Sequence, residues 1–342
     1  MSSPSLLRAA VIGAGAMGRN HCRVYRELPG VELVGLADAD LGTAERAGKQ
    51  FGTAHFTTPA ALLAAVRPDL VTVAVPTMAH LPVALECLAH GAHLLVEKPL
   101  AFTVAEGRAI IAAAQAAGRV LAVGHVERYN PALTELKARL DAGALGRVFQ
   151  MHAQRLGPFP ARVRDVGVVV DLATHDVDIM RYLSGSEVTR VYAETARQIH
   201  TDHEDLLSGL LRFADGTIGV LDINWLTPTK IRQLTITGEK GMFQVNYLNQ
   251  DLYFYENDWI HSQWDAISAI SGVSEGNMLR LRLDRAEPLR RELEQFVAAV
   301  RGEAATIVSG EDGLRAVAIT QQIVQAGLTG QVITTRAVSR EP

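Results

Sequence analysis

The chain has 342 residues, of which 48% are hydrophobic and 20% charged, so it is long enough for two domains with cores of ordinary size. A net charge of −4 gives no reason to expect a nucleic-acid or membrane-surface partner. No apolar run approaches a membrane span, no leader-like segment precedes the first strand pattern, and the two cysteines lie far apart, so we expect a cytoplasmic protein without a zinc site or a disulfide framework.

Residues 8–125 alternate strand patterns with helix patterns. Apolar, often β-branched runs predict strands at 9–13, 31–38, 69–76, 93–97 and 119–126. Helices are predicted in the intervals, including one from Pro59 after the N-cap Thr58 and one over 104–117 after the capping-box pair Thr103 and Glu106. Continuous apolar strands separated by helices predict an α/β domain over 1–125, with a doubly wound parallel sheet of the Rossmann type.

The pattern changes in the second domain, which we place at 126–342. Alternating runs between 146 and 256, separated by turn residues, predict an antiparallel meander. One helix near 171–183 interrupts it, and two more, at 287–301 and 311–327, close the chain and could pack back on the first domain. We therefore expect an α+β domain with a large open, mainly antiparallel sheet. Residues 257–286 have mixed patterns and receive no role.

A glycine-rich turn follows the first predicted strand. Gly13, Gly15 and Gly18 have GxGxxG spacing and open a helix, the context in which this motif binds a dinucleotide pyrophosphate. Asp38 ends the second predicted strand, where a carboxylate can hold both ribose hydroxyls and would repel a 2′-phosphate. We predict NAD, with NADP less favoured and kept open because of Arg46. A glycine turn without a ligand is the alternative.

The stretch HLLVEKPLAF, residues 93–102, places Glu97, Lys98 and Pro99 at the end of a predicted strand. In a parallel sheet this end faces the crevice in which cofactors bind, although a plain surface loop would also explain these residues. Oxidation of an alcohol by a nicotinamide needs a base for the hydroxyl proton. A lysine can be that base where burial and the positive nicotinamide favour its neutral form. We hypothesise that Lys98 is this base.

Polar residues recur at helical spacing in residues 168–185. Asp171, His175, Asp178 and Tyr182 would share one face of a helix, which could present Asp171 and His175 to a cleft. His175, oriented by Asp171, would then assist Lys98 at the same hydroxyl. The alternative is a solvated acidic face. We predict no metal site, because no convincing third ligand joins this pair.

These motifs resemble the Gfo/Idh/MocA family of glucose–fructose oxidoreductase and inositol dehydrogenase. GAGAMG, Asp38, VPTMAH (75–80), EKP (97–99) and DLATH (171–175) occur in the family's order. The resemblance implies a sugar dehydrogenase with Lys98, Asp171 and His175 as its catalytic set, and a homodimer or homotetramer formed through the open sheet. The predicted cofactor contacts are Gly13, Gly15, Ala16, Met17, Gly18, Asp38, Pro76, Thr77, His80, Glu97 and Lys98. His80 could equally be a surface residue that caps a helix.

A narrower resemblance lies in residues 124–133 and 155–178, which are similar to UDP-N-acetylglucosamine 3-dehydrogenases. These enzymes oxidise the sugar's 3-hydroxyl to a 3-keto sugar. Arginines suit the diphosphate because their forks bind phosphate oxygens in pairs, although a solvated basic loop is as good an explanation for Arg155–Arg164. Residues 128–130 could also be a packed linker. The predicted substrate contacts are Arg128, Tyr129, Asn130, Arg155, Arg162, Arg164, Asp171 and His175.

Three functions remain open at this point. The first is NAD-dependent oxidation of a nucleotide sugar at C3, with UDP-N-acetylglucosamine as the leading substrate. The second is the same chemistry on a free sugar or inositol. The third is a dinucleotide-binding regulator, which would not need Lys98, Asp171 and His175 together. Trp225, Trp259 and Trp264 are expected in the core or at an interface.

Overall fold

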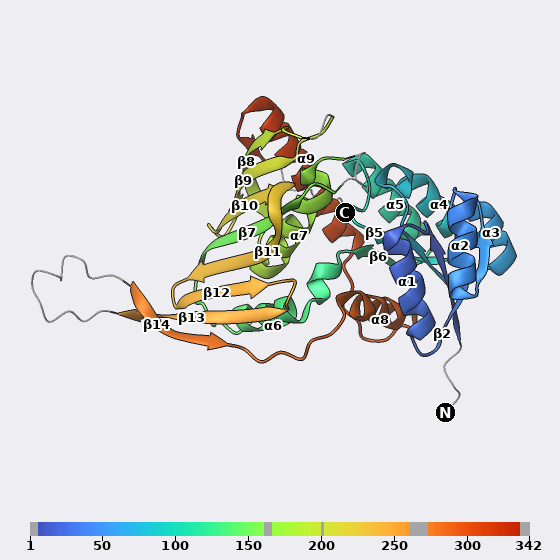
Figure 1. Ribbon diagram of the computed structural model, residues 1–342, viewed down its shortest axis with the longest axis horizontal. Helices are drawn as coiled ribbons and strands as arrows, with labels where there is room; N and C mark the ends of the chain where they lie inside the picture. Colours follow the sequence, from blue (N-terminus) through green and yellow to red (C-terminus); the bar gives the residue numbers. More distant parts are fainter. Residues whose placement is uncertain (1–5, 161–165, 200–201, 260–272, 336–342) are drawn as a thin grey trace, which may run out of the picture. The chain divides into compact units, whose positions relative to one another are not determined.

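The computed structural model describes residues 6–160, 166–199, 202–259 and 273–335 (Figure 1). Arg162, Arg164 and Trp264, which the sequence analysis singled out, lie outside this part of the chain. No helix among the described residues is both long and apolar enough to cross a bilayer.

Contacts divide the chain into two compact units. The first runs to Val126 and includes Glu287–Ala318, and the second comprises Glu127–Ala286 and the residues from Ile319 onward. This division differs from the predicted cut after residue 125, because a C-terminal segment belongs to the first unit. The sequence analysis left room for this, because it noted that the C-terminal helices could pack back on the first domain.

The first unit contains a six-stranded parallel sheet in the order β3-β2-β1-β4-β5-β6 (Figure 1, blue to cyan). Its strands are β1 Leu7–Ile12, β2 Val31–Ala37, β3 Ala54–Phe56, β4 Leu70–Val73, β5 His93–Glu97 and β6 Leu121–Gly124. The prediction of a Rossmann-type doubly wound sheet is confirmed; only the short β3 was missed. The strand order reverses between β1 and β4, and ligands of such sheets bind at the carboxyl ends of the strands near this point.

Helices cover this sheet. They are α1 Ala16–Glu27, α2 Leu41–Phe51, α3 Pro59–Val66, α4 His80–Ala89, α5 Val104–Ala116 and α8 Pro288–Val300. Thr58 caps α3, and Thr103 and Glu106 form a capping box on α5, as their spacing predicts. The helices α1 and α8 lie side by side and share one apolar core with β1 and β2 (Figure 1). The return of α8 therefore completes the first unit's core.

The second unit contains a nine-stranded sheet in the order β14-β13-β12-β11-β7-β10-β9-β8-β15. Its strands are β7 Val148–Pro158, β8 Val188–Ala196, β9 Leu206–Phe213, β10 Ile218–Asn224, β11 Leu226–Gly238, β12 Gly241–Asn246, β13 Asp251–Trp259, β14 Val273–Arg280 and β15 Ile333–Thr334. The prediction of a simple meander was wrong in the middle of the sheet. There β7 lies between β10 and β11 and runs parallel to β10, so the sheet is mixed and mainly antiparallel.

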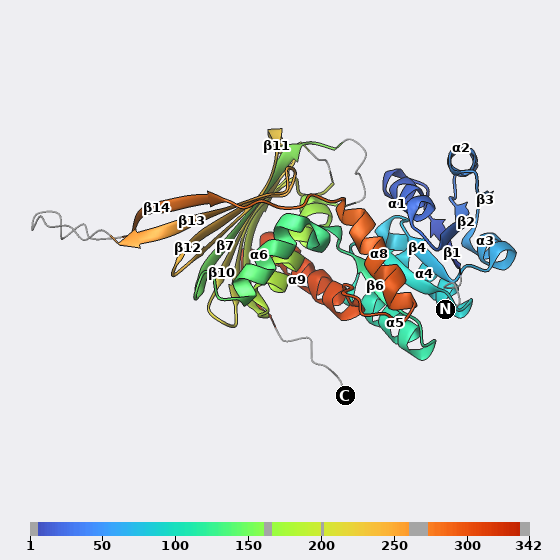
Figure 2. The same cartoon turned by 90° about the horizontal axis from the view of Figure 1, so that it is seen from below.

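One face of this sheet is covered by helices. They are α6 Pro131–Asp141, α7 Thr174–Ser184 and the second half of α9 Gly310–Thr329, whose apolar side chains form a single core with the strands (Figure 2). Trp225 belongs to that core, as expected. Three elements were missed: β14, in the segment that received no role, α6, and the two-residue β15. The second of these had a readable signal, because Asn130 before Pro131 is an N-cap followed by a proline at the first helical position.

Candidate functional site

The glycine turn between β1 and α1 requires its glycines for different reasons. Gly13 has a φ of +96°, and an added Cβ would lie 2.3 Å from the Ala74 carbonyl oxygen. A Cβ on Gly18 would lie 1.7 Å from the carbonyl oxygen of Gly13. At Gly15 a Cβ would meet no atom within 4 Å. The first and last glycines thus close the turn, whereas the middle one leaves room for a ligand.

The N-terminus of α1 opens into that room. No side chain caps it, and no acidic residue stands in its first turn. Its first backbone bond runs from the Arg19 amide to the Gly15 carbonyl, which leaves the amides of Ala16, Met17 and Gly18 without acceptors in the helix. Such a terminus favours an anion through its amides and its dipole. The residues therefore fit the pyrophosphate of a dinucleotide.

Asp38 is tied to this turn. Its Oδ2 accepts a hydrogen bond from the Ala14 amide at 2.7 Å, and its Oδ1 accepts one from the Asp40 amide at 3.0 Å. Arg46 donates to the Thr43 hydroxyl at 3.0 Å and lies 3.9 Å from the Asp40 carboxylate. The carboxylate of Asp38 thus stands beside the turn, and the guanidinium of Arg46 already has Asp40 as an acidic neighbour.

Glu97 and Lys98 lie at the carboxyl end of β5. Glu97 is buried: its Oε1 is 2.8 Å from His21 Nε2, and its Oε2 accepts the Lys98 amide hydrogen at 3.2 Å. Burial would raise the pKa of Glu97, but His21 and the positive Lys98 hold it below its ordinary value. The buried carboxylate therefore supports the turn, and Lys98, which is only half-buried, is the residue of this pair with access to solvent.

His80 connects two of the predicted motifs. Its Nδ1 is 2.9 Å from the carbonyl oxygen of Pro99, and its Nε2 is 3.0 Å from that of Val75. The side chain is 1% exposed, so the alternative of a surface cap was wrong. His80 holds the turn after Lys98 against the loop that follows β4. That loop carries Pro76 and Thr77, which remain partly exposed to solvent at the strand end.

A second buried carboxyl lies near Glu97. Glu292 of α8 is 1% exposed, and neither of its carboxyl oxygens has a hydrogen-bond partner among the described residues. Burial raises its pKa well above the ordinary value, and the charge of Glu97 adds to the shift. The surroundings of Glu292 in the first unit therefore favour its neutral form.

Glu292→Gln is expected to flatten the pH dependence of stability. In the unfolded chain this carboxyl ionises near the ordinary pKa of 4.5, whereas in the folded protein it keeps its proton to higher pH. The wild type therefore loses stability as the pH rises from the unfolded-state pKa to the folded-state pKa. Glutamine mimics the neutral acid but cannot ionise. The variant should match the wild type near about pH 4 and exceed it by roughly 1–3 kcal/mol near pH 8. Thermal unfolding across that range measures this, with the exposed Glu294→Gln on the same helix as the control. Parallel curves for wild type and variant would contradict it.

Asp171 and His175 lie in the second unit, at the start of its central helix. Asp171 belongs to a π-helical turn, Val169–Ala173, and His175 to the first turn of α7. Both are half-exposed, whereas Leu172 and Asp176 beside them are buried. The two predicted catalytic side chains therefore share the accessible side of this segment.

Glu204, which the sequence analysis missed, holds this segment in place. Its Oε1 accepts the Val169 amide hydrogen at 3.2 Å, and its backbone carbonyl accepts that of Val168 at 2.8 Å. A Cβ on Gly167 would lie 2.1 Å from the Glu204 carboxylate, so this approach requires glycine. The contact joins Gly167 and Glu204, which lie 37 positions apart, so no local sequence pattern could predict it.

Of the other two residues of the predicted polar face, Asp178 is buried and Tyr182 is half-exposed. Asp178 is 1% exposed and forms a paired salt bridge with Arg128, with Nε–Oδ2 at 2.7 Å and Nη2–Oδ1 at 2.5 Å. The same guanidinium lies 4.9 Å from the ring centre of Tyr182. Arg128 thus pairs with Asp178 and stacks on Tyr182, so these two members of the predicted polar face take part in packing contacts.

Two more predicted substrate contacts serve the fold. Asn130 caps α6 through the Ala132 amide at 3.1 Å and donates to the Tyr247 carbonyl at 3.1 Å. Arg155 is 3% exposed and donates to both oxygens of Asp176, at 2.6 and 3.1 Å, and to Glu127 at 3.2 Å. The geometry contradicts a diphosphate role for Arg155 and favours the packed-linker alternative for Asn130. Tyr129 remains half-exposed.

Comparison with known proteins gives matches in both units. Residues 7–125 match an oxidoreductase family with an NAD-binding Rossmann fold, and residues 133–244 match the GFO/IDH/MocA C-terminal domain. Within the described residues no cluster of three or more His, Cys, Asp or Glu side chains could hold a metal ion.

Three individual proteins are informative. The chain is 30% identical to UDP-N-acetylglucosamine 3-dehydrogenase of Acidithiobacillus ferrooxidans, over 93% of this chain and 96% of that one. A solved structure of that enzyme has a TM-score of 0.82 at 29% identity, covering 94% and 97% of the two chains. WlbA dehydrogenase of Bordetella pertussis, solved with NADH and UDP-GlcNAcA, has a TM-score of 0.80 at 25% identity, covering 96% and 99%. Inositol 2-dehydrogenase 4 of Saccharopolyspora erythraea is 38% identical over 54% of this chain and 56% of that one.

Proposed function

Because the chain belongs to the Gfo/Idh/MocA oxidoreductase family, we propose that it oxidises the C3 hydroxyl of a nucleotide sugar, with UDP-N-acetylglucosamine as the leading candidate. One observation carries the choice of substrate. The similarity to UDP-N-acetylglucosamine 3-dehydrogenase extends over 93% of the chain, through the substrate domain as well as the cofactor domain. The chain is an enzyme of the dehydrogenase class, and its cofactor is a nicotinamide dinucleotide.

The proposed form of the cofactor is NAD. Asp38 stands at the end of β2 beside the glycine turn, and each of its oxygens, though bonded to an amide, keeps a lone pair for a ribose hydroxyl. A 2′-phosphate would face the carboxylates of Asp38 and Asp40. Arg46, the residue that kept NADP open, already lies beside Asp40 and Thr43. These charges support NAD over NADP.

The proposed chemistry uses residues of both units. Bound NAD supplies the hydride acceptor for the carbon that is oxidised. Lys98 Nζ takes the hydroxyl proton, so that the alcohol oxygen can form a carbonyl double bond as the hydride departs. His175 hydrogen-bonds the same oxygen, with Asp171 orienting its ring. Glu97 and His80 are positioning residues, because they fix the backbone on either side of Lys98.

The test is NADH formation, followed at 340 nm, by the purified chain with NAD and UDP-N-acetylglucosamine, beside free N-acetylglucosamine and myo-inositol. A parallel reaction with a 2-oxo acid, analysed by mass spectrometry, detects a 3-keto sugar even when NADH is reoxidised in place. We expect oxidation of the UDP-sugar alone.

Sedimentation velocity on the same preparation tests the proposal of a homodimer or homotetramer formed through the sheet face that helices leave uncovered.

The second candidate is a dehydrogenase of a free cyclitol. The 38% identity to an inositol 2-dehydrogenase favours it, although that match covers 54% of this chain. Oxidation of myo-inositol without oxidation of the UDP-sugar would support this alternative and leave the roles of Lys98, Asp171 and His175 in place. A chain that binds NAD but oxidises no member of a broad sugar panel would instead favour the regulator.

A further inference from the structure

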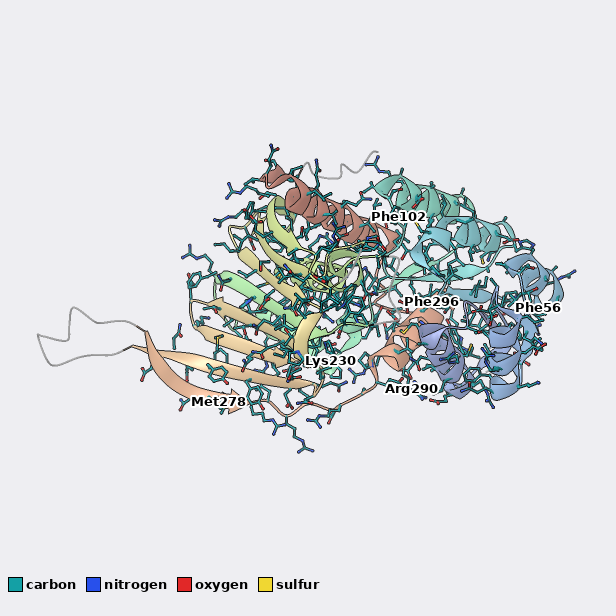
Figure 3. The ribbon with its side chains drawn as sticks, turned by 45° about the horizontal axis from the view of Figure 1, so that its top comes forward. Phe56, Phe102, Lys230, Met278, Arg290 and Phe296 are labelled. Atoms are coloured by element: carbon teal, nitrogen blue, oxygen red, sulfur yellow. The ribbon has the colours of Figure 1, made fainter. Side chains whose placement is uncertain are left out.

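Three large polar side chains form a row across the helix-covered face of the second unit's sheet. Tyr247 follows β12, and its amide donates to the Arg232 carbonyl on β11 at 3.0 Å. Arg232 in turn lies directly opposite Arg155 on β7. Lys230, labelled in Figure 3, marks the part of β11 two residues before Arg232. Two arginines at opposed positions repel each other, so each needs a source of negative charge.

The two arginines differ in what neutralises them. Arg155 is bound by Asp176 and Glu127. In the described parts of the chain Arg232 forms no ion pair. Its Nη1 donates to the carbonyl oxygens of Leu156 and Ile231, at 2.6 and 2.7 Å, and no described residue forms a hydrogen bond with its Nε or Nη2. A guanidinium has five hydrogens in a planar fork, so most of its donors are unused.

Arg232 is also removed from much of its water. Burial, and after it the charge of Arg155, lower its pKa to about 10 against the opposing effect of Asp176, Glu127 and Asp171. Tyr247, next in the row, is 5% exposed, and its hydroxyl has no hydrogen-bond partner among the residues described. A half-buried cation without a counter-ion and a buried hydroxyl without a partner are both costly, and an anion could relieve the first of these costs.

The position of Arg232 points to the substrate. Asp171, the predicted catalytic carboxylate, is among the charges that act on its guanidinium. We propose that Arg232 determines substrate specificity by binding an anionic oxygen group of the substrate, either a phosphate of the diphosphate or a carboxylate on the sugar. The proposal rests on the proposed function, in which a nucleotide sugar binds against Asp171 and His175. Arg232 thereby takes the anion-binding role predicted for Arg155, whose guanidinium is already bound by acidic side chains.

The experiment is isothermal titration calorimetry on the NADH-loaded protein. The ligands are UDP-N-acetylglucosamine, its UDP-linked uronic acid, free N-acetylglucosaminuronate and neutral N-acetylglucosamine. The proteins are the wild type, Arg232→Gln, Arg232→Lys and the control Lys230→Gln, which removes an exposed charge two residues away on the same strand. Thermal melting establishes that each variant is folded.

Arg232→Gln should weaken binding of the recognised anion about 10- to 100-fold, because a charge-assisted bond at a half-buried site is lost. Arg232→Lys should recover part of that loss, and Lys230→Gln should bind as the wild type does. Neutral N-acetylglucosamine should bind all four proteins alike. Weaker binding of both UDP-sugars, but not of the free uronate, assigns the diphosphate. Weaker binding of the two uronates alone assigns the sugar carboxylate.

Three results test this proposal separately from the function on which it rests. If the wild type binds and oxidises UDP-sugars and Arg232→Gln binds every ligand equally well, the role of Arg232 is wrong and the function stands. The role is equally wrong if the neutral sugar loses as much affinity as the anions, which a merely structural arginine would produce. If the wild type binds the free uronate through Arg232 but no UDP-sugar, the nucleotide-sugar function fails and the anion site stands. No binding of any anionic ligand overturns both.

Discussion

Lys98→Met is expected to lower kcat about a thousand-fold, within the range that general-base catalysis contributes. Methionine keeps much of the length of the lysine stem but cannot accept the hydroxyl proton. The turn itself is held by Glu97 and by His80 through bonds to backbone groups, so the substitution should leave its geometry unchanged. Steady-state NADH formation with the best substrate from the sugar panel measures the loss.

The informative control for Lys98 is cofactor affinity. The glycine turn and Asp38 are predicted to provide most of the dinucleotide's binding energy. The NADH dissociation constant of the variant should therefore stay within about threefold of the wild type, a change in binding free energy of less than about 1 kcal/mol. Lys49→Met, on the exposed end of α2, should alter neither quantity. Unchanged kcat in Lys98→Met would remove the lysine from the mechanism. A loss of NADH binding that matches the loss of turnover would make it a cofactor ligand instead.

Asp176→Ala is expected to destabilise the second unit by about 3–5 kcal/mol, the usual cost of leaving a buried charge without its partner. Arg155 is 3% exposed, and the acidic partners Asp176 and Glu127 raise its pKa against the effect of burial, so it stays charged in the fold. Removal of Asp176 leaves Glu127, whose single hydrogen bond to Arg155 is 3.2 Å long. Thermal and urea unfolding, followed by circular dichroism, measure the change.

A matched control for this pair is present on α6. Glu135 and Arg139 form an ion pair four residues apart, with side chains 38% and 40% exposed. Glu135→Ala should therefore cost no more than about 0.5 kcal/mol. The double variant Asp176→Leu/Arg155→Met, which replaces the pair by apolar side chains, should regain much of the stability lost in Asp176→Ala. Equal costs for the buried and the exposed pair would show that Arg155 finds another partner or water.

The cofactor half of the site could be read from the sequence because its signals are local. A strand, a glycine turn and a helix start stand in one short stretch, in which Gly13 has a φ of +96° and a Cβ on Gly18 would meet the Gly13 carbonyl. The capping residues Thr58 and Thr103 act over three positions. Lys98 follows from its place at the end of an apolar strand. Periodicity and caps report interactions between near neighbours, which a linear pattern can contain.

The substrate half was predicted less well because its arginines are chosen by distant partners. Arg128, Arg155 and Arg232 are chemically equivalent in the sequence. Arg128 meets Asp178 across 50 positions, and Arg155 meets Asp176 across 21, whereas Arg232 meets two carbonyls. Charge patterning drew attention to Arg155 and not to Arg232. Only the pairing of β11 with β7 shows which arginine is neutralised and which is not.

The sequence by itself determined that this chain has a dinucleotide-binding parallel domain and a second domain built on a mainly antiparallel sheet, and it placed the proposed catalytic residues Lys98, Asp171 and His175 at element ends. These follow from periodicity, turn chemistry and motif order, together with the family resemblance that the comparisons confirm. The tertiary structure alone decided the mixed order of the second sheet, the return of α8 to the first unit, and the division of polar side chains between ion pairs and open site. Those outcomes depend on which residues, distant in sequence, pack together in the core. An unpaired charge is costly to bury, and a charged side chain that is paired in the core is no longer available to bind a ligand.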